Sequence, residues 1–413
     1  MININDLNLK SDILPFYNFT KNKMSLQRLE EFLSCKPNTL EIAVESQKLI
    51  QYVLNQKDFI KNYHYNVLYL SEAYYFMHHL QEYETIYLRF VNPFNVIDYS
   101  KVIQTLMILH QIKTITQLLE DHEAPEKFKE LKKNSLDVFE QYEIEKHLEI
   151  HQQRILKRKD FITIYQKLFK DQEIIKKILN DFMDIEIYYS IAKAIQTYNY
   201  TIPTLTIDDL DLKQFYHPKL KHPVKNDFKP TKHLVLLSGA NMSGKSTFFK
   251  SVALCIYLGN LGLPIPAESS RIPFYNSINI RISHQDDITN GYSHFMNEIV
   301  NLKEYILQIK RQNNVIGFYD ELYSGTNTHD AMELFSTTIK GLSKINNGLT
   351  FISSHIHELK DELELNEQIE IYHLECKIKD EKPLYTYQLK EGYNAMKIGQ
   401  IIFRNEGLYQ LLQ

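Results

Sequence analysis

The segment from Gly239 to Thr247, GANMSGKST, fits the phosphate-loop pattern G-x-x-x-x-G-K-[ST]. It follows an apolar run that predicts a strand at 234–237, and it opens a predicted helix at 247–258. Glycines in such a loop let backbone N–H groups curl around phosphate oxygens, and the helix N-terminus adds its positive dipole end. We therefore predict that this half of the chain binds and hydrolyses ATP. The residues expected to contact the nucleotide are Gly239, Ala240, Asn241, Met242, Ser243, Gly244, Lys245, Ser246 and Thr247.

Two side chains of this loop have expected roles of their own, because Lys245 should reach the β- and γ-phosphates and Ser246 should ligate Mg²⁺. Further along the chain, the apolar run 315–319 ends directly in Asp320 and Glu321. Sheets of α/β proteins bind their ligands at the carboxyl ends of strands. An acidic pair at such a place is by itself more often a helix N-cap. Downstream of a phosphate loop, we expect Asp320 to hold Mg²⁺ and Glu321 to orient or deprotonate the attacking water.

A third apolar run, which begins at Phe351, ends in His355. A neutral imidazole at the end of a strand can hydrogen-bond the γ-phosphate or the attacking water. A lone histidine is more often an ordinary surface or core residue, and we hold that view of the nearby His357. In the context of the two preceding motifs, we expect His355 to act with Glu321 as a catalytic residue.

The elements that must position these residues are indicated by the distribution of glycine and proline. Met1 to Tyr200 contain no glycine, and apolar residues recur there at helical spacing, as in Leu26, Leu29 and Leu33. Prolines then mark an irregular connector, after which β-type and helical runs alternate. We predict a multidomain α + α/β protein with an all-helical domain at 1–200, a connector at 201–230 and an ATPase domain at 231–413. Apolar runs at 233–238, 276–283, 315–319 and 350–354 predict a largely parallel sheet, and 382–391 predicts a late edge strand.

The composition excludes several classes of protein. The chain has 413 residues, 44% of them hydrophobic, and a formal net charge of −4, which is untypical of a strongly basic nucleic-acid binder. Its three cysteines are isolated and odd in number, which argues against a secreted disulfide scaffold. The sequence has no signal-peptide pattern and no apolar stretch long enough for a membrane span. We expect a cytoplasmic, nucleoid-associated protein without a membrane partner.

The three motifs together resemble the ATPase domain of the MutS family, the ABC-type ATPases of DNA mismatch repair. The resemblance rests most strongly on the run DELYSGTNTHD from Asp320 to Asp330, with SHIHEL from Ser354 to Leu359. It extends over about residues 215–407. Weaker similarity to the family's helical core, or lever, domain occurs at Met24–Pro37 and Asp184–Ala192.

The resemblance implies a mechanism that involves two subunits. Family members dimerise through their ATPase domains and hold each nucleotide between two subunits. In this chain, Ser293 would reach the γ-phosphate bound by the partner subunit, and Asn241 would sense the γ-phosphate of its own site. Asp330 would lie at the dimer interface. ATP would then stabilise a closed homodimer, and hydrolysis would release it.

The sequence also departs from the family pattern. His294 replaces a usual threonine, Ser243 and Ala331 replace common glycines, and Tyr323-Ser324 replaces a common glycine-arginine pair. Because the resemblance begins almost at the helical core, we expect a short form that lacks the mismatch-recognition and connector domains. Such a form would bind branched or otherwise structured DNA, or act beside full-length MutS-type proteins, rather than read mismatches directly.

Two further features of the helical half could contact DNA. The basic cluster at 154–159 could bind phosphates, although a solvated helix face explains it as well. Tyr63, Tyr65, Tyr69, Tyr74 and Tyr75 could stack on bases, although their helical spacing favours packing.

The expected function is a dimeric, DNA-stimulated ATPase that couples ATP binding and hydrolysis to DNA engagement. The alternative is an ATP-gated protein-interaction switch that binds no DNA. A membrane-transporter ATPase is disfavoured, because the L-S-G-G-Q signature is missing.

Overall fold

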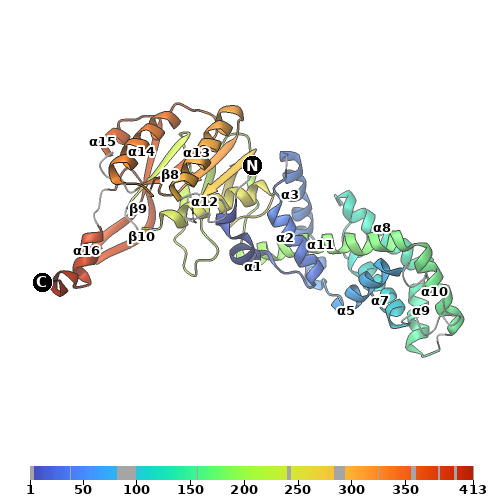
Figure 1. Cartoon of the computed structure of the whole chain (residues 1–413). Helices are drawn as coiled ribbons and strands as arrows, with labels where there is room; N and C mark the ends of the chain where they lie inside the picture. The colour runs from blue at the N-terminus through green and yellow to red at the C-terminus, as the bar shows by residue number, and fades with distance from the viewer. Residues whose placement is uncertain are drawn as a thin grey trace. The chain divides into compact units, whose positions relative to one another are not determined.

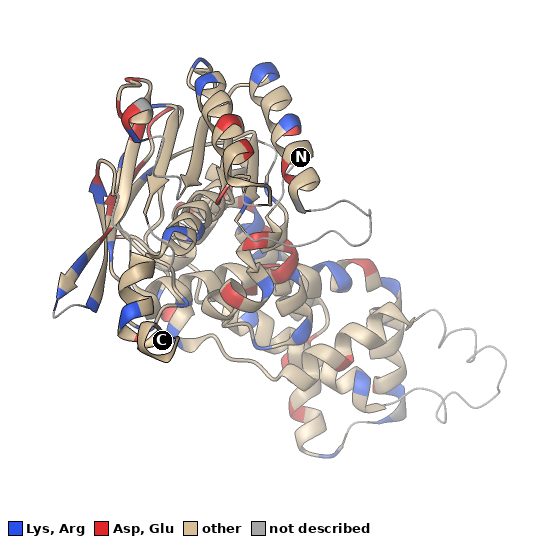
Figure 2. Ribbon diagram, turned by 60° about the vertical axis from the view of Figure 1, so that its left-hand side comes forward, with Lys and Arg blue, Asp and Glu red and all other residues tan. Residues whose placement is uncertain are grey.

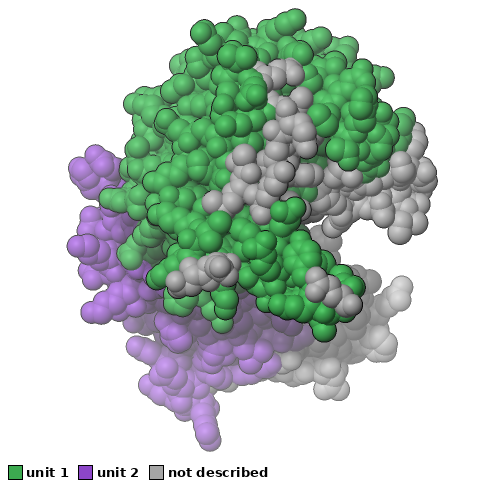
Figure 3. Space-filling view, turned by 90° about the vertical axis from the view of Figure 1, so that its left-hand side faces the viewer, with its two compact units in different colours: residues 1–16, 33–46, 198–413 green, residues 17–32, 47–197 purple. Residues whose placement is uncertain are grey.

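The computed structural model describes residues 4–37, 39–80, 99–155, 157–239, 243–282, 294–323, 325–354, 360–379, 382–394 and 398–412. The chain divides into two compact units (Figure 3). Unit 1 comprises residues 1–16, 33–46 and 198–413, and unit 2 comprises residues 17–32 and 47–197. The predicted domain limits stay a prediction. In the structure, the last boundary between the two units lies between residues 197 and 198. The N-terminal segments 1–16 and 33–46 also belong to unit 1.

Unit 2 is built from helices, as its glycine-free sequence and helical spacing predict (Figure 1). Their bounds are α2 Lys23–Ser34, α3 Leu40–Asn55, α4 Lys57–Asn62, α5 Val67–His78, α7 Tyr99–Thr116, α8 Glu126–Gln141, α9 Ile144–Gln152, α10 Arg158–Lys170 and α11 Gln172–Tyr198, of which α2, α3 and α11 run on into unit 1. Pro125 caps the start of α8, where its missing N–H costs nothing. None of the described helices is long and apolar enough to cross a membrane.

A buried polar network fixes the N-terminal part of unit 2 to the middle of α11. The Glu186 carboxylate accepts hydrogen bonds from the Lys21 backbone N–H (2.7 Å), the Asn22 side chain (2.6 Å) and the Tyr65 hydroxyl (2.8 Å). Burial raises the pKa of Glu186, against the lowering effect of the Ser25 and Tyr65 hydroxyls and the Lys21 backbone N–H. The buried charge is therefore satisfied by hydrogen bonds from three points of the chain.

The structure shows where the tyrosines and the basic cluster at 154–159, the two candidate DNA contacts of unit 2, lie in the fold. Tyr63 and Tyr65 are buried, and Tyr63 stacks on Tyr189, so packing explains these two residues. Tyr75 is exposed, with the Lys101 ammonium over its ring. The basic cluster is exposed at Arg154, in the turn after α9, rather than on a continuous helix face. Figure 2 shows that acidic and basic residues are interleaved along these helices. Some of them form ion pairs, as in Lys177–Glu130 and Lys127–Asp184.

Unit 1 contains a six-stranded sheet with the strand order β10-β9-β4-β8-β7-β6. The strands are β4 Leu234–Ser238, β6 Ser277–Arg281, β7 Val315–Tyr319, β8 Leu349–Ser354, β9 Ile369–Lys379 and β10 Lys382–Glu391. All neighbours run parallel except the edge hairpin of β9 and β10. The predicted parallel sheet and late edge strand are thus confirmed, whereas β9 was not predicted from the sequence.

Helices cover both faces of this sheet (Figure 1). They are α12 Lys245–Asn260, α13 His294–Arg311, α14 Thr328–Leu342 and α15 Lys360–Glu364. Two further helices, α16 Ile398–Asn405 and α17 Leu408–Leu411, follow the edge hairpin at the C-terminus. Alternation along β7 explains the two layers, because Phe318 packs against Phe249 of α12 while Tyr319 packs against Tyr305 of α13. Gly317 permits the close approach of α13, since a Cβ atom there would lie 2.6 Å from the Tyr305 ring.

The segment predicted as an irregular connector forms most of a second, four-stranded sheet, in the order β1-β5-β2-β3. Its strands are β1 Thr204–Thr206, β2 Asp211–Phe215, β3 Asn226–Phe228 and β5 Ser269–Pro273. The connector's prolines (203, 218, 223 and 230) all lie outside these strands, so they limit strand length without preventing pairing. The N-terminal residues form three short helices, η1 Asn5–Leu7, η2 Leu9–Ile13 and α1 Leu14–Tyr17, which lie in unit 1 except for Tyr17.

Candidate functional site

The predicted phosphate loop leads from the buried strand β4 to helix α12. Gly239 and Gly244 have φ angles of +139° and +98°, a region in which side-chain-bearing residues are strained. Gly244 is the N-cap of α12, so the helix begins at Lys245, two residues earlier than predicted. Among the described residues, the buried Ser243 hydroxyl has no hydrogen-bond partner. The loop therefore brings the start of a four-turn helix and an unpaired hydroxyl to the carboxyl end of β4.

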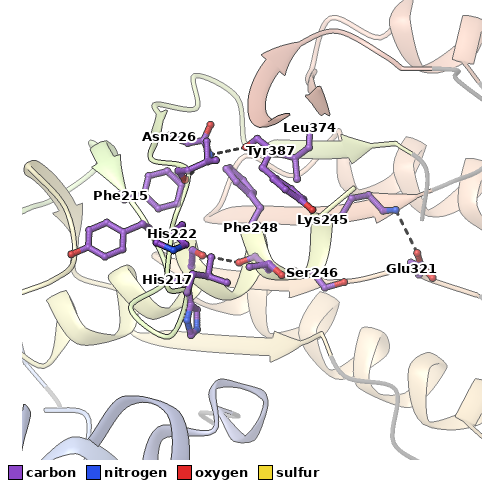
Figure 4. A pocket seen from close by; sticks show the side chains of 16 residues that line it. Phe215, His217, His222, Asn226, Lys245, Ser246, Phe248, Glu321, Leu374 and Tyr387 are labelled. Atoms are coloured by element: carbon purple, nitrogen blue, oxygen red, sulfur yellow. Dashed lines mark hydrogen bonds and ion pairs between the residues drawn. The ribbon is translucent and has the colours of Figure 1, made fainter. Parts of the chain in front are cut away.

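The Lys245 side chain is 4% exposed and joins the loop to the next motif. Its Nζ atom donates to the Gly239 carbonyl oxygen at 2.9 Å and lies 3.5 Å from Oε1 of Glu321 (Figure 4). The structure therefore brings together two residues that the sequence assigned to the same site. Ser246 and Thr247 are exposed at the first turn of α12 and line the same cavity.

The acidic pair follows strand β7, as predicted, and neither residue caps a helix. Asp320 is 6% exposed, and its backbone N–H donates to the Arg281 carbonyl oxygen of β6 at 3.0 Å. Ser353 of β8 fixes both acidic residues, because its hydroxyl donates to Oδ1 of Asp320 and accepts the Glu321 backbone N–H at 2.9 Å. Glu321 has a left-handed φ of +51°. Ser353 was not predicted as a site residue, although its position two residues before His355 was the available signal.

A cavity of about 530 Å³ extends from Lys245 along the first turn of α12. Glu321 lies at one end of the lining, and aromatic and aliphatic side chains form the other (Figure 4). The complete lining is Phe215, Tyr216, His217, Leu220, His222, Val224, Asn226, Gly244, Lys245, Ser246, Thr247, Phe248, Ser251, Glu321, Leu374 and Tyr387. The arrangement combines a charged, hydrogen-bonding end with an apolar end, as a site for an amphiphilic small molecule requires.

The aromatic end of the cavity was not predicted from the sequence. Phe215 packs edge-on against Phe248 at 5.5 Å between ring centroids. Tyr387 of β10 lines the cavity from the other side, and a Cβ atom on Gly244 would lie 3.1 Å from its Cδ1 atom. These residues come from three separate elements, and no local sequence pattern connects them.

His217 lies in this wall with little exposure to solvent. Burial lowers the pKa of its imidazole, and the positive charges of Lys250 and Lys219 add to this, whereas Asp12 opposes it. Nδ1 lies 3.4 Å from the backbone N–H of Lys219 and accepts its hydrogen bond. His217 is therefore a neutral side chain at neutral pH, which suits a cavity wall better than an anion site.

Several predicted residues lie outside the described residues, and their roles stay predictions. These residues are Ala240, Asn241, Met242, Ser293 and His355. Asp330 is described, in the first turn of α14, where its side chain accepts a hydrogen bond from Asn327 at 2.6 Å.

The described residues contain no group of three or more His, Cys, Asp or Glu side chains placed to hold a metal ion. Magnesium that accompanies a nucleotide does not need such a group, because phosphate oxygens and water supply most of its ligands. The oxygen donors expected for it are both present, as the exposed Ser246 hydroxyl in the cavity and the buried Asp320 carboxylate after β7. The chemistry of these donors fits Mg²⁺.

Comparisons with known proteins relate this site to a family. The family model for MutS domain V matches residues 235–408, which include the loop, α12 and the acidic pair. The DNA mismatch repair protein MutS of Staphylococcus epidermidis is 28% identical over 258 residues, which are 60% of this chain and 28% of that protein. The protein of the same name from Listeria monocytogenes is 30% identical over 241 residues, 56% of this chain and 28% of that protein.

A third relative agrees with these two. The DNA mismatch repair protein MutS of Halalkalibacterium halodurans is 32% identical over 185 residues, 43% of this chain and 21% of that protein. The chain thus spans less than a third of the length of the curated relatives it matches. From the domain V match and these similarities we conclude that residues 235–408 of this chain are similar to domain V of the MutS family.

Proposed function

We propose that unit 1 binds and hydrolyses ATP at the cavity between the 239–247 loop and the acidic pair. One observation carries this proposal, namely that the Lys245 ammonium at the start of α12 lies 3.5 Å from the Glu321 carboxylate after β7. A phosphate chain at the helix N-terminus would take the Gly239 carbonyl's place as the partner of Lys245. Glu321 would then lie beside the terminal phosphate, and the whole domain would be an ABC-type P-loop ATPase.

The apolar end of the cavity would bind the base. Tyr387 and Phe248 offer aromatic faces there, and the neutral His217 adds no charge. Stacking on such faces orients a base without requiring a charged partner. The phosphates and the base would therefore lie at opposite ends of one cavity, along the first turn of α12.

The catalytic roles follow from this placement. Mg²⁺, when bound, would neutralise phosphate charge. Ser246 and Asp320 would hold it, and the Ser353 hydroxyl would keep Asp320 in place. Glu321 would orient the attacking water or accept its proton, and His355 would hydrogen-bond the γ-phosphate or that water. The Glu321 backbone would stay fixed during this step through its bond to Ser353.

We further propose that two copies of the chain close on ATP and that this closure controls DNA binding. The similarity of residues 235–408 to MutS domain V supports both steps, and the curated relatives are named as DNA mismatch repair proteins. In such a homodimer, Ser293 would approach the γ-phosphate held by the other copy, and Asn241 would sense it within its own site. The DNA would be structured or mismatched, and the protein would act in the cytoplasm near the nucleoid, alone or beside full-length MutS-type proteins.

The test is ATP turnover measured without DNA and with duplex, branched and single-stranded DNA, each at two salt concentrations. The proposal predicts turnover that DNA stimulates, with a stimulation that fades as salt rises, because phosphate contacts release counterions. Lys245→Ala is the matched control and should abolish nucleotide binding. Turnover without binding to any DNA form would contradict the DNA step and favour an ATP-gated protein-interaction switch. No turnover under any condition would contradict the ATPase.

A further inference from the structure

Two aromatic residues, Phe215 of β2 and Tyr387 of β10, form walls of the cavity's apolar end, and side chains of the short strand β3 hydrogen-bond to the backbone at or beside both of them. Strand β3 pairs with β2, where Leu212 pairs with Phe228 and Phe215 pairs with Asn226. The register shifts by one residue between these two pairs, because β2 has two residues between them and β3 has one. The extra residue of β2 leaves a bulge that includes Gln214, whose φ is +50°. Beyond the bulge, β2 delivers Phe215 to the cavity.

The other wall rests on a second bulge. In the β9–β10 hairpin, Tyr385 pairs with Cys376 and Leu389 with Leu374, so the three residues 386–388 of β10 face the single residue 375 of β9. Tyr387 lies inside this bulge with a φ of +56°. It is 43% exposed and reaches over Gly244 at the start of α12. A tyrosine in the left-handed region is strained by about 1–3 kcal/mol and needs support from its surroundings.

Asn226 of β3 supplies that support for Tyr387. Its side-chain amide donates to the Tyr387 carbonyl oxygen at 3.0 Å (Figure 4). The amide oxygen accepts the Leu389 backbone N–H at 2.8 Å. The amide thereby satisfies one carbonyl and one N–H of the bulge, as the backbone of a neighbouring strand would.

Asp227, the next residue, supports the bulge of β2. Its Oδ1 atom accepts the Gln214 backbone N–H at 2.8 Å and the Gln214 side-chain amide at 2.9 Å. The hydrogen bond from the Gln214 backbone, with that from its side chain, lowers the pKa of Asp227, so the carboxylate is ionised at neutral pH. Neighbouring residues of β3 thus hold two left-handed residues on two different strands.

We propose that Asn226 and Asp227 are positioning residues that set the base end of the nucleotide cavity, each by fixing one bulge that carries an aromatic wall. The proposal rests on the ATP site proposed above. Neither side chain needs to touch the phosphates, since both act on the backbone of wall residues. Their removal should therefore change the binding of the base and leave the binding of a phosphate chain unchanged.

The experiment compares the affinity of the full chain for ATP with its affinity for inorganic tripolyphosphate, which has no base. We expect Asn226→Ala and Asp227→Ala to weaken ATP binding about three- to tenfold, the effect of losing one hydrogen bond or its equivalent in packing. Tripolyphosphate affinity should not change. Asp227→Asn should stay near the wild type, because its amide oxygen can still accept the Gln214 N–H. Asn226→Asp should be intermediate, because it keeps only the acceptor for Leu389.

Controls separate this effect from general destabilisation. Asn276→Ala removes an asparagine amide that donates to a backbone carbonyl, that of Asn313 at 3.1 Å, and it should change neither affinity. In a Tyr387→Ala background, Asn226→Ala should cause no further loss, because Asn226 acts through Tyr387. If Asn226→Ala fails to fold, Asn226→Asp still gives the comparison. If Asp227→Ala fails to fold, Asp227→Leu replaces it with the same expected loss, because it removes both hydrogen bonds to Gln214 and keeps a side chain of similar size.

The outcomes distinguish this proposal from the ATP site itself. Equal loss of ATP and tripolyphosphate affinity, or no loss of either in folded variants, would overturn the positioning roles while leaving the ATP site intact. A wild-type chain that binds tripolyphosphate but shows no gain in affinity from the base would overturn the base site. A wild-type chain that binds neither ligand would overturn the proposed function and this inference together.

Discussion

At the scale of single residues, the most consequential side chain that was not predicted as a site residue is Ser353. Its buried hydroxyl joins the Asp320 carboxylate to the Glu321 backbone. Ser353→Ala should leave the half-buried N–H of Glu321 and the buried carboxylate of Asp320 with one hydrogen bond fewer each. We expect a loss of about 1–3 kcal/mol in the free energy of unfolding and a lower rate of ATP turnover. Urea unfolding and turnover assays check this.

The comparison variants sharpen that prediction. Ser71→Ala removes a hydroxyl that only bonds the Val67 carbonyl within helix α5, so its unfolding free energy should change little. Ser353→Thr keeps the hydroxyl and should retain part of the turnover. If Ser353→Ala unfolds and turns over ATP like the wild type, the serine does not hold the acidic pair.

Gly244 permits a second prediction at this scale. Its φ of +98° disfavours a side chain, and so does the Tyr387 ring, which would lie 3.1 Å from a Cβ atom at this position. Gly244→Ala should therefore lower the free energy of unfolding by about 1–3 kcal/mol and weaken nucleotide binding. Gly341→Ala is the matched control, because Gly341 lies within α14 and a Cβ atom there would meet nothing within 4 Å, and it should stabilise by about 0.5–1 kcal/mol. Unfolding and ATP-binding assays on both variants decide; equal effects would contradict this prediction.

At the scale of elements, the Glu186 network should make the stability of unit 2 depend on pH. Burial raises the pKa of Glu186 above its usual 4.5, so between these values the folded state binds more protons than the unfolded state. Stability should therefore fall as pH rises through that interval and become level above it. Glu186→Gln removes the titration, so the wild type should lose stability relative to this variant across the interval. Chemical unfolding of both proteins between pH 4 and pH 8 tests this, and a constant difference would contradict it.

How far the sequence predicts these elements depends on where their stability comes from. Strands β4, β7 and β8 are continuous apolar runs beside turn signals, and a buried parallel strand needs little more to be recognised. Strands β2 and β3 read DLKQF and NDF, and their pairing depends on side-chain bonds such as Asp227 to Gln214. Strand β9 did carry a readable signal, since its buried residues alternate at Tyr372, Leu374 and Cys376. The position of Tyr387 was unpredictable, because it depends on a bulge held from a strand far away in the sequence.

At the scale of the whole molecule, the proposed function requires that ATP joins two copies of the chain. Glu321→Gln keeps the size of the side chain and its place beside Lys245 but removes the carboxylate that would activate water. ATP would then remain bound without being hydrolysed. Because ATP would bind the closed dimer more tightly than the monomer, this variant should run as a dimer in sizing experiments at saturating ATP. The double variant Lys245→Ala/Glu321→Gln should stay monomeric, because it cannot hold the nucleotide. A Glu321→Gln protein that binds ATP and remains monomeric would refute the two-subunit mechanism while leaving the cavity as a nucleotide site.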